Sequence, residues 1–205
     1  MPVFQKDNKQ VLFIHVPKTA GSSVNKLFVN NGYEMSYYSE SSKDLHNGLC
    51  GPQHLDSLLL EDEFRDFSQF DYIFSIFRDP VDRHLSEFTW APWGLMGRNI
   101  YTPERFDEWC PRIFKAYQDS PYRMDNHIRP QHEFYVNGCD VYDYENIDTL
   151  TEKLCDKIGL DNKEMPYERS SRYDSEDYVI YEDTYDCITE FYKGDYQWQK
   201  DSVLL

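Results

Sequence analysis

The stretch that decides the fold joins an apolar run to a polar loop and a helix, and it reads Val11-Leu12-Phe13-Ile14-His15-Val16-Pro17-Lys18-Thr19-Ala20-Gly21-Ser22-Ser23. A continuous apolar run of this length is typical of a strand buried in a parallel sheet, and Pro17 ends it. Beyond the loop, Val24, Leu27 and Phe28 recur at helical spacing as far as Asn31-Gly32, a common helix C-terminus. The stretch therefore predicts a strand, a loop and a helix in direct succession.

The same succession recurs further along the chain. Residues 71–77 predict a second buried strand, which ends at Arg78; Asp79 then caps a helix whose first residue is Pro80. Further strands are predicted at residues 33–38 and 140–144. A short helix is predicted just after His54, where Leu55, Leu58 and Leu59 mark it, and another begins at Thr102. The last two predicted helices run from the cap Asp148 to Gly159 and from about Ser175 to Gly194. Alternating strands and helices predict an α/β fold with a mainly parallel central sheet, helices on both faces, and ligands at the carboxyl ends of the strands.

Size and charge limit the kinds of protein this chain encodes. A length of 205 residues fits one domain, so we expect residues 1–205 to form a single unit. With 21 basic and 37 acidic residues the formal net charge is −16, which argues against nucleic acid or another polyanion as a partner bound through a broad basic surface. An anionic ligand must therefore be held locally.

The sequence has no segment typical of export or of membrane insertion. The N-terminal residues lack an apolar stretch of signal-peptide length, and no later window is long and apolar enough to cross a bilayer. The five cysteines are scattered, odd in number and never spaced Cys-x-x-Cys, which argues against a disulfide framework. We expect a cytoplasmic chain with reduced thiols and no membrane partner.

The loop at residues 17–23 has the features of an anion site. Backbone N–H groups and the positive end of a helix dipole converge there; Lys18 adds a charge, and Thr19, Ser22 and Ser23 add hydroxyls. It is not a Walker A loop, because the lysine precedes the glycine, and no Gly-x-Gly-x-x-Gly occurs in the chain. The alternative is that the hydroxyls only cap the helix and that Lys18 is solvated.

A second loop offers a guanidinium at the end of the other strand. Arg78 leaves the strand at residues 71–77, so its planar fork can bind a phosphate at the same edge of the sheet as the first loop. Ser86 follows about two turns into the next helix and can donate to the same group. Taken alone, Arg78 is better explained by an ion pair with Asp79 or Asp82.

Together, the segments 13–23 and 77–86 resemble the two donor-binding motifs of the carbohydrate sulfotransferase family, the Golgi type that includes heparan, chondroitin and dermatan sulfotransferases. This resemblance implies a three-layer, P-loop-like fold and the donor 3′-phosphoadenosine 5′-phosphosulfate (PAPS), with 3′-phosphoadenosine 5′-phosphate (PAP) as product. It implies that the 5′-phosphosulfate is bound by Pro17, Lys18, Thr19, Ala20, Gly21, Ser22 and Ser23, and the 3′-phosphate by Arg78 and Ser86.

Weaker matches extend the resemblance along the chain. His54 stands where many members carry a histidine, and Arg129-Pro130-Gln131 resembles a segment of the family, as do Asp140 and Glu145-Asn146 after it. Residues 168–172 fall where relatives have a nucleotide-contacting loop. The asparagine that the resemblance implies is missing there, and we expect Arg169 or Arg172 to take its place in binding the nucleotide.

Sulfuryl transfer needs stabilisation of a leaving group and a base for the acceptor hydroxyl. Lys18 is the candidate for the first role. His54 is the candidate for the second, since an imidazole titrates near neutrality and a position at a helix N-terminus disfavours its charged form. A lone histidine is often a surface or core residue instead, and we expect His15, in its buried strand, to be structural.

No metal site is expected from the sequence. His46, Cys50 and His54 are spaced four apart, but Gly48, Gly51 and Pro52 break any helix that would align them.

The sequence thus predicts a PAPS-dependent sulfotransferase that needs no metal and acts on a hydroxyl acceptor, a glycan or small molecule. The acidity of the chain favours a neutral or weakly charged acceptor. The alternatives are a nucleotide-binding protein of the same fold without turnover, and a nucleotide-dependent kinase.

Overall fold

The fold is built on a five-stranded mixed sheet with the strand order β3-β1-β2-β4-β5. The computed structural model describes residues 1–39, 41, 43–90, 101–161, 164–166 and 178–202. The strands are β1 (Val3–Lys6), β2 (Lys9–Ile14), β3 (Glu34–Ser36), β4 (Tyr72–Phe77) and β5 (Asp140–Asp143). The helices are α1 (Gly21–Asn30), α2 (Ser57–Glu63), α3 (Pro80–Trp90), α4 (Pro103–Asp119), α5 (Ile147–Ile158), α6 (Glu182–Phe191) and α7 (Lys193–Asp201).

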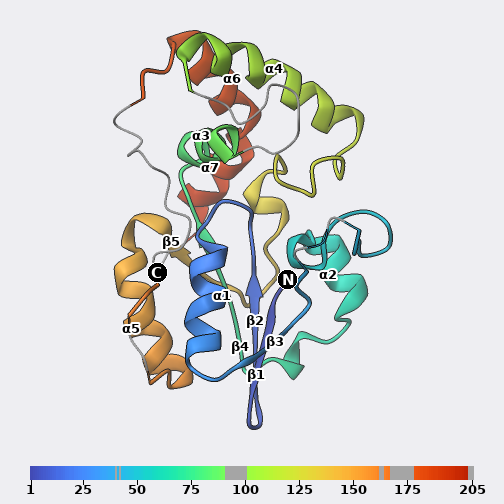
Figure 1. Ribbon diagram of the computed structural model, residues 1–205, viewed down its shortest axis with the longest axis vertical. Helices are drawn as coiled ribbons and strands as arrows, with labels where there is room; N and C mark the ends of the chain where they lie inside the picture. Colours follow the sequence, from blue (N-terminus) through green and yellow to red (C-terminus); the bar gives the residue numbers. More distant parts are fainter. Residues whose placement is uncertain (40, 42, 91–100, 162–163, 167–177, 203–205) are drawn as a thin grey trace.

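Helices cover the sheet on both faces, as the sequence predicts. Strands β2, β4 and β5 run parallel, and α1 and α5 lie on one face while α2 lies on the other (Figure 1). The side chains of β2 alternate accordingly: Val11 and Phe13 pack with α1 and α5, whereas Leu12 and Ile14 pack on the side of α2. The apolar run that decides the fold is therefore buried on both faces, which confirms the α/β fold class.

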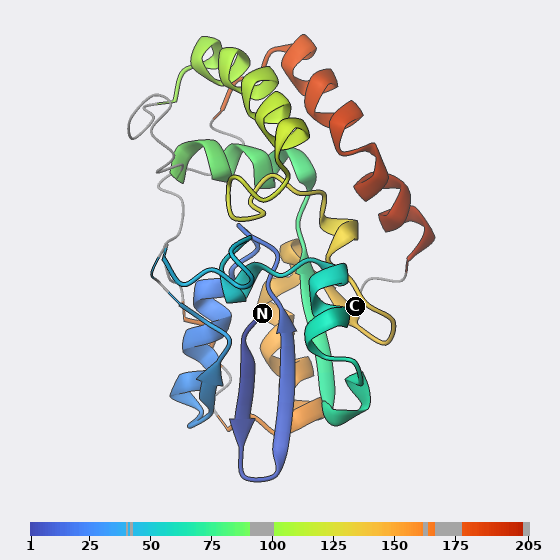
Figure 2. The same cartoon turned by 90° about the vertical axis from the view of Figure 1, so that its right-hand side faces the viewer.

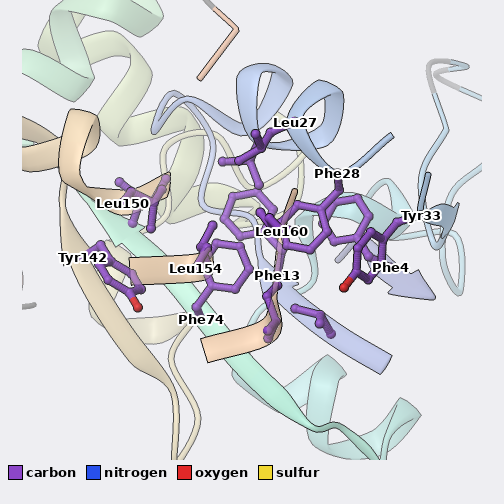
Figure 3. Packing of buried hydrophobic residues seen from close by; sticks show 14 residues of the cluster. Phe4, Phe13, Leu27, Phe28, Tyr33, Phe74, Tyr142, Leu150, Leu154 and Leu160 are labelled. Carbon is purple, nitrogen blue, oxygen red and sulfur yellow. The ribbon is translucent and has the colours of Figure 1, made fainter. Parts of the chain in front are cut away.

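Aromatic rings fill the core between the sheet and the helices α1 and α5 (Figure 3). Phe4 and Phe28 stack with ring centroids 4.0 Å apart, and Phe13 stacks on Phe74 at 4.9 Å. Since α1 is fixed by this packing, its N-terminus is held at the carboxyl end of β2.

A second group of helices lies beyond the carboxyl ends of the parallel strands (Figures 1 and 2). Helices α3, α4 and α6 share a core of their own, whose members include Leu85, Phe88, Trp109 and Ile188. Because α3 starts directly after β4, this group forms a second wall beside the edge of the sheet where ligands are expected.

The hairpin at the N-terminus was not predicted. Strand β1 pairs antiparallel with both β2 and β3, so the sheet is mixed, and its parallel pairs are β2 with β4 and β4 with β5. The hairpin turns at Asp7, whose φ of 54° is one that Asp tolerates better than most residues. The Asp7-Asn8 pair between two apolar runs was its signal in the sequence.

The prediction of one final helix from Ser175 to Gly194 was wrong within the described residues. Residues 178–181 are not helical, α6 ends at Phe191, and Gly194 lies inside a further helix, α7. Gly194 is needed for close packing rather than for a helix end, because a Cβ there would lie 2.5 Å from Cε1 of His132.

Two helix starts also differ from the prediction. The N-cap of α2 is Asp56, whose carboxylate accepts from the N–H of Leu59, and Leu58 of that helix is exposed. Helix α5 begins at Ile147 with Asn146 as its N-cap, so Asp148 is a residue of the helix and not its cap.

No helix in the described part of the chain combines the length and the apolar character needed to span a bilayer.

Candidate active site

The loop between β2 and α1 presents the N-terminus of α1 without a capping side chain. Its N-cap is Ala20, which forms no side-chain cap hydrogen bond, and the first turn of α1 has no acidic residue. Lys18 and Ala20 both adopt left-handed φ values, 69° and 65°. Such backbone is costly for side-chain-bearing residues, so the surrounding packing must hold this loop in place. Uncapped N–H groups at a positive helix end can bind an anion.

The side chains of the loop differ in their surroundings. Thr19 is fully buried, and its hydroxyl donates to the carbonyl oxygen of Val16 at 2.8 Å. This hydrogen bond stabilises the conformation of the loop. Pro17 and Ser23 are buried, and Ser22 is half-buried. The interpretation that the hydroxyls merely cap the helix is not supported, because the cap position belongs to Ala20.

Arg78 reaches the lysine loop from the end of β4. Its Nη1 donates to the carbonyl oxygen of Lys18 at 3.2 Å, and its guanidinium carbon lies 4.4 Å from the ring centroid of Tyr144. The backbone of Arg78 is held by Gln131, whose amide donates to the Arg78 carbonyl at 2.7 Å and accepts from the Arg78 N–H at 3.1 Å. The two loops therefore meet at one edge of the sheet, as the sequence predicts.

Of the remaining residues predicted to bind the donor, the structure describes Ser86 only. Ser86 lies within α3 and is half-buried. Arg169 and Arg172, with the whole stretch 168–172, lie outside the described residues.

His54 lies at the end of the short 3₁₀ helix Pro52–His54, before α2 rather than at its N-terminus. Its Nδ1 is 2.8 Å from Oδ2 of Asp125. Burial is the main cause that lowers the pKa of His54, and the hydrogen bond to Asp125 opposes this shift. The pKa of His54 is thus lowered as expected, but desolvation and not a helix dipole lowers it.

Asp125 is suited to orient His54. Burial acts to raise the pKa of Asp125, but the hydrogen bonds from His54 and from the N–H of Gly51 outweigh it and the pKa is lowered. An ionised Asp125 accepts a hydrogen bond from Nδ1 of His54 and so favours the tautomer with the lone pair on Nε2, which a general base requires.

Three imidazoles form a row at the site. The ring of His54 lies 5.0 Å from that of His15 and 4.9 Å from that of His127. His15 is buried, which lowers its pKa far below the usual range, and its ring packs so closely on Gly21 that a Cβ there would lie 1.7 Å from Nε2. The structure thus places His15 against both the loop at residues 17–23 and His54.

Lys18 is connected to this row through an aromatic ring. The Nζ of Lys18 lies 4.5 Å from the ring centroid of Trp90, and Trp90 stacks on His127 with centroids 5.0 Å apart and ring planes 9° apart. The ammonium and the imidazoles therefore border one site.

Sequence reasoning missed most residues that organise the site. All three residues of the segment Asp125-Asn126-His127 contact His54. Asp125 bonds its Nδ1, the Asn126 amide donates to its carbonyl oxygen at 2.7 Å, and the ring of His127 packs against its ring. Asp125 and Asn126 both have left-handed φ values, 51° and 60°. An Asp-Asn pair directly before a histidine and the Arg-Pro-Gln segment was the available signal.

Arg129 is also part of this framework. Its Nη2 lies 3.0 Å from Oδ2 of Asp56, and only 8% of the residue is exposed. Arg129 is thus not a surface arginine, and this buried pair ties the segment to the start of α2.

Among the described residues, His54, Asp125 and His127 are a group that could hold a metal ion, with ligand atoms all within 4.8 Å of one another. His46 and Cys50 are not members of this group: they pair with each other through a backbone bridge, and the Cys50 thiol donates to the carbonyl oxygen of His54 at 3.5 Å.

The geometry offers an uncapped helix N-terminus, a lysine, an arginine at the same edge and an oriented imidazole, an arrangement suited to transfer from an anionic donor. The family model described as Sulfotransferase family matches residues 1–198. No curated protein and no solved structure matches the chain. Because the family match covers nearly all of the 205 residues, the chain belongs to the sulfotransferase family, which includes carbohydrate sulfotransferases, and it is a PAPS-dependent sulfotransferase.

Proposed function

We propose that this enzyme transfers the sulfuryl group of PAPS to a hydroxyl of a carbohydrate, with residues 17–23 binding the 5′-phosphosulfate and Arg78 and Ser86 binding the 3′-phosphate. The observation that carries the proposal is the hydrogen bond from Arg78 Nη1 to the carbonyl oxygen of Lys18. The guanidinium of Arg78 there reaches the backbone of the loop that carries Lys18, 60 residues away in the sequence, in a chain whose net charge is −16. Such local convergence is what a small, doubly phosphorylated donor requires.

In the proposed reaction, the acceptor oxygen forms a bond to sulfur while the bond from sulfur to the 5′-phosphate oxygen breaks. Nε2 of His54 takes the proton of the acceptor hydroxyl, and Asp125 holds the ring in the tautomer that allows this. Lys18 stabilises the charge that develops on the leaving phosphate oxygen. No covalent bond to the protein is needed, so positioning and charge carry the catalysis.

We propose an acceptor that is neutral or weakly charged. A polyanionic glycan would be repelled by a chain with 37 acidic against 21 basic residues. A local basic patch is also not supported at two of the arginines, because Arg129 is buried and Arg112 lies 3.8 Å from Glu108.

The test is transfer of radiolabelled sulfate from PAPS to a panel of neutral oligosaccharides, sulfated glycosaminoglycans, lipids, simple phenols and tyrosyl peptides. We expect labelled product from a neutral sugar, with turnover lost in Lys18→Ala and in His54→Ala. Transfer only to a glycosaminoglycan would contradict the proposed acceptor, and transfer that survives both substitutions would contradict the proposed site.

A further inference from the structure

One titratable pair in the site has no part in the reaction described so far. The ring of His127 lies 4.9 Å from the ring of His54 and stacks on the ring of Trp90. The Nζ of Lys18 contacts the same Trp90 ring. His127 therefore lies between the candidate base and the lysine that stabilises the leaving group. In a direct displacement, the sulfur and its oxygens occupy the space between these two ends.

A buried carboxylate fixes the ring of His127. Oε2 of Glu87, on α3, lies 2.7 Å from Nδ1 of His127, and Glu87 is only 1% exposed. Placing a carboxylate in the protein interior costs free energy unless it is paired, so this pair is a specific feature of the site. With Nδ1 engaged by Glu87, any role of the ring in chemistry belongs to Nε2.

We propose that His127 is a further catalytic residue, which donates a hydrogen bond from Nε2 to an oxygen of the sulfuryl group during transfer, and that Glu87 is its positioning residue. This inference rests on the proposed function of the site. The sulfuryl group passes from the phosphate oxygen to the acceptor oxygen and the acceptor proton passes to His54, while His127 keeps its own proton. A donor aimed at charge that develops in the transition state accelerates the reaction without adding a chemical step.

Steady-state kinetics with saturating PAPS and acceptor test the role. We expect His127→Ala to lower kcat about 10²- to 10³-fold, the usual effect of removing one such donor, while the Kd for PAP changes less than about twofold. His127→Gln keeps an N–H donor and should recover part of the loss. Glu87→Gln should lower kcat with little change in KM.

The matched control is His132, whose Nδ1 likewise lies 2.7 Å from a buried carboxylate, that of Asp195, but outside the row of imidazoles. His132→Ala should keep kcat. Thermal unfolding of each variant distinguishes loss of the fold from loss of the Nε2–H hydrogen-bond donor. If His127→Ala does not fold, His127→Gln is assayed in its place.

A spectroscopic test needs no acceptor. In ¹H–¹⁵N spectra of the imidazoles, PAPS should shift the Nε2 resonance of His127 relative to PAP, because the two ligands differ only in the sulfuryl group. Identical spectra with both ligands would overturn the proposed role of His127 but not the proposed function. Normal kcat in His127→Ala, with His54→Ala inactive, would do the same. Absence of PAP binding to the intact enzyme would overturn the proposed function as well. Activity that is lost on chelation and restored by zinc in the wild type only would make His127 a metal ligand instead.

Discussion

The candidate base depends on a residue that lies 71 positions away in the sequence. His54 and Asp125 meet because the left-handed backbone at Asp125 and Asn126 directs one side chain to the Nδ1 of His54 and the other to its carbonyl oxygen. Neither the pairing nor the backbone conformation is readable from local pattern, since both are set by tertiary packing. The sequence predicted His54 as the base, but not the carboxylate that orients it.

Asp125→Asn should lower kcat about 10²- to 10⁴-fold. An amide in place of the carboxylate can donate to Nδ1 and so favour the tautomer that blocks Nε2, an effect of up to about 10⁴-fold in a comparable histidine–aspartate pair. Assays of kcat alongside PAP binding check this. Asp62→Asn, on the exposed face of α2, is the control and should be neutral. Full activity in Asp125→Asn would rule out an orienting role for the carboxylate.

The pH dependence of kcat/KM should also report His54. The base must be neutral to accept a proton, and burial lowers its pKa below the usual 6.5. The acid limb of the profile should therefore lie below pH 6.5, and His54→Ala should remove the limb with the activity. A limb at or above pH 6.5 would show that another group is the base.

At the scale of elements, the carboxyl end of β4 is held by a helix from the far end of the chain. The buried carboxylate of Asp195, on α7, accepts from the N–H groups of Gln131 and His132, each at 3.0 Å. The side-chain amide of Gln131 in turn hydrogen-bonds the backbone of Arg78. The strand-loop-helix units at residues 11–30 and 72–90 were predictable, because their apolar runs and caps are local signals. The division between α6 and α7 was not, since Gly194 serves a contact with another element.

Gly194→Ala should destabilise the protein by about 1–3 kcal/mol, the usual cost of forcing an extra methyl into a packed site. The new Cβ would lie 2.5 Å from the ring of His132, which is itself held by Asp195. Denaturant unfolding measures the change. Lys193→Ala, one residue earlier on an exposed position, is the control and should change stability by less than about 0.5 kcal/mol. Equal stability of the two variants would contradict the close packing of α7.

At the scale of the whole molecule, several imidazoles are buried without charge. Burial lowers the pKa values of His15 and His54, and that of His84 to about 3. Unfolding exposes these groups, which then take up protons below about pH 6.5, so their contribution to stability is present above that pH and is lost as the pH falls. His132 acts in the opposite direction, because the hydrogen bond to Asp195 raises its pKa.

His84→Phe should make the fold less sensitive to acid. Each proton taken up only on unfolding changes stability by about 1.4 kcal/mol per pH unit, and for His84 this applies from about pH 6.5 down toward its folded pKa of about 3. The aromatic neighbours Phe106, Trp109 and Phe114 can accommodate a phenyl ring, and Tyr192 keeps its bond to the Ile128 carbonyl.

Unfolding curves at pH 7 and pH 5 measure that difference, with the half-buried His46→Ala as control. A pH dependence that His84→Phe leaves unchanged would show that His84 is not buried as a neutral ring.

The central claim is that the loop of Lys18 and the guanidinium of Arg78 bind opposite ends of one nucleotide, and calorimetry with PAP and with adenosine 5′-phosphate tests it most directly. The two ligands differ only in the 3′-phosphate. We predict that Arg78→Ala weakens PAP to the affinity of adenosine 5′-phosphate and leaves the latter unchanged, whereas Lys18→Ala weakens both. Equal losses for both ligands in Arg78→Ala, or unchanged PAP binding in either variant, would contradict the claim.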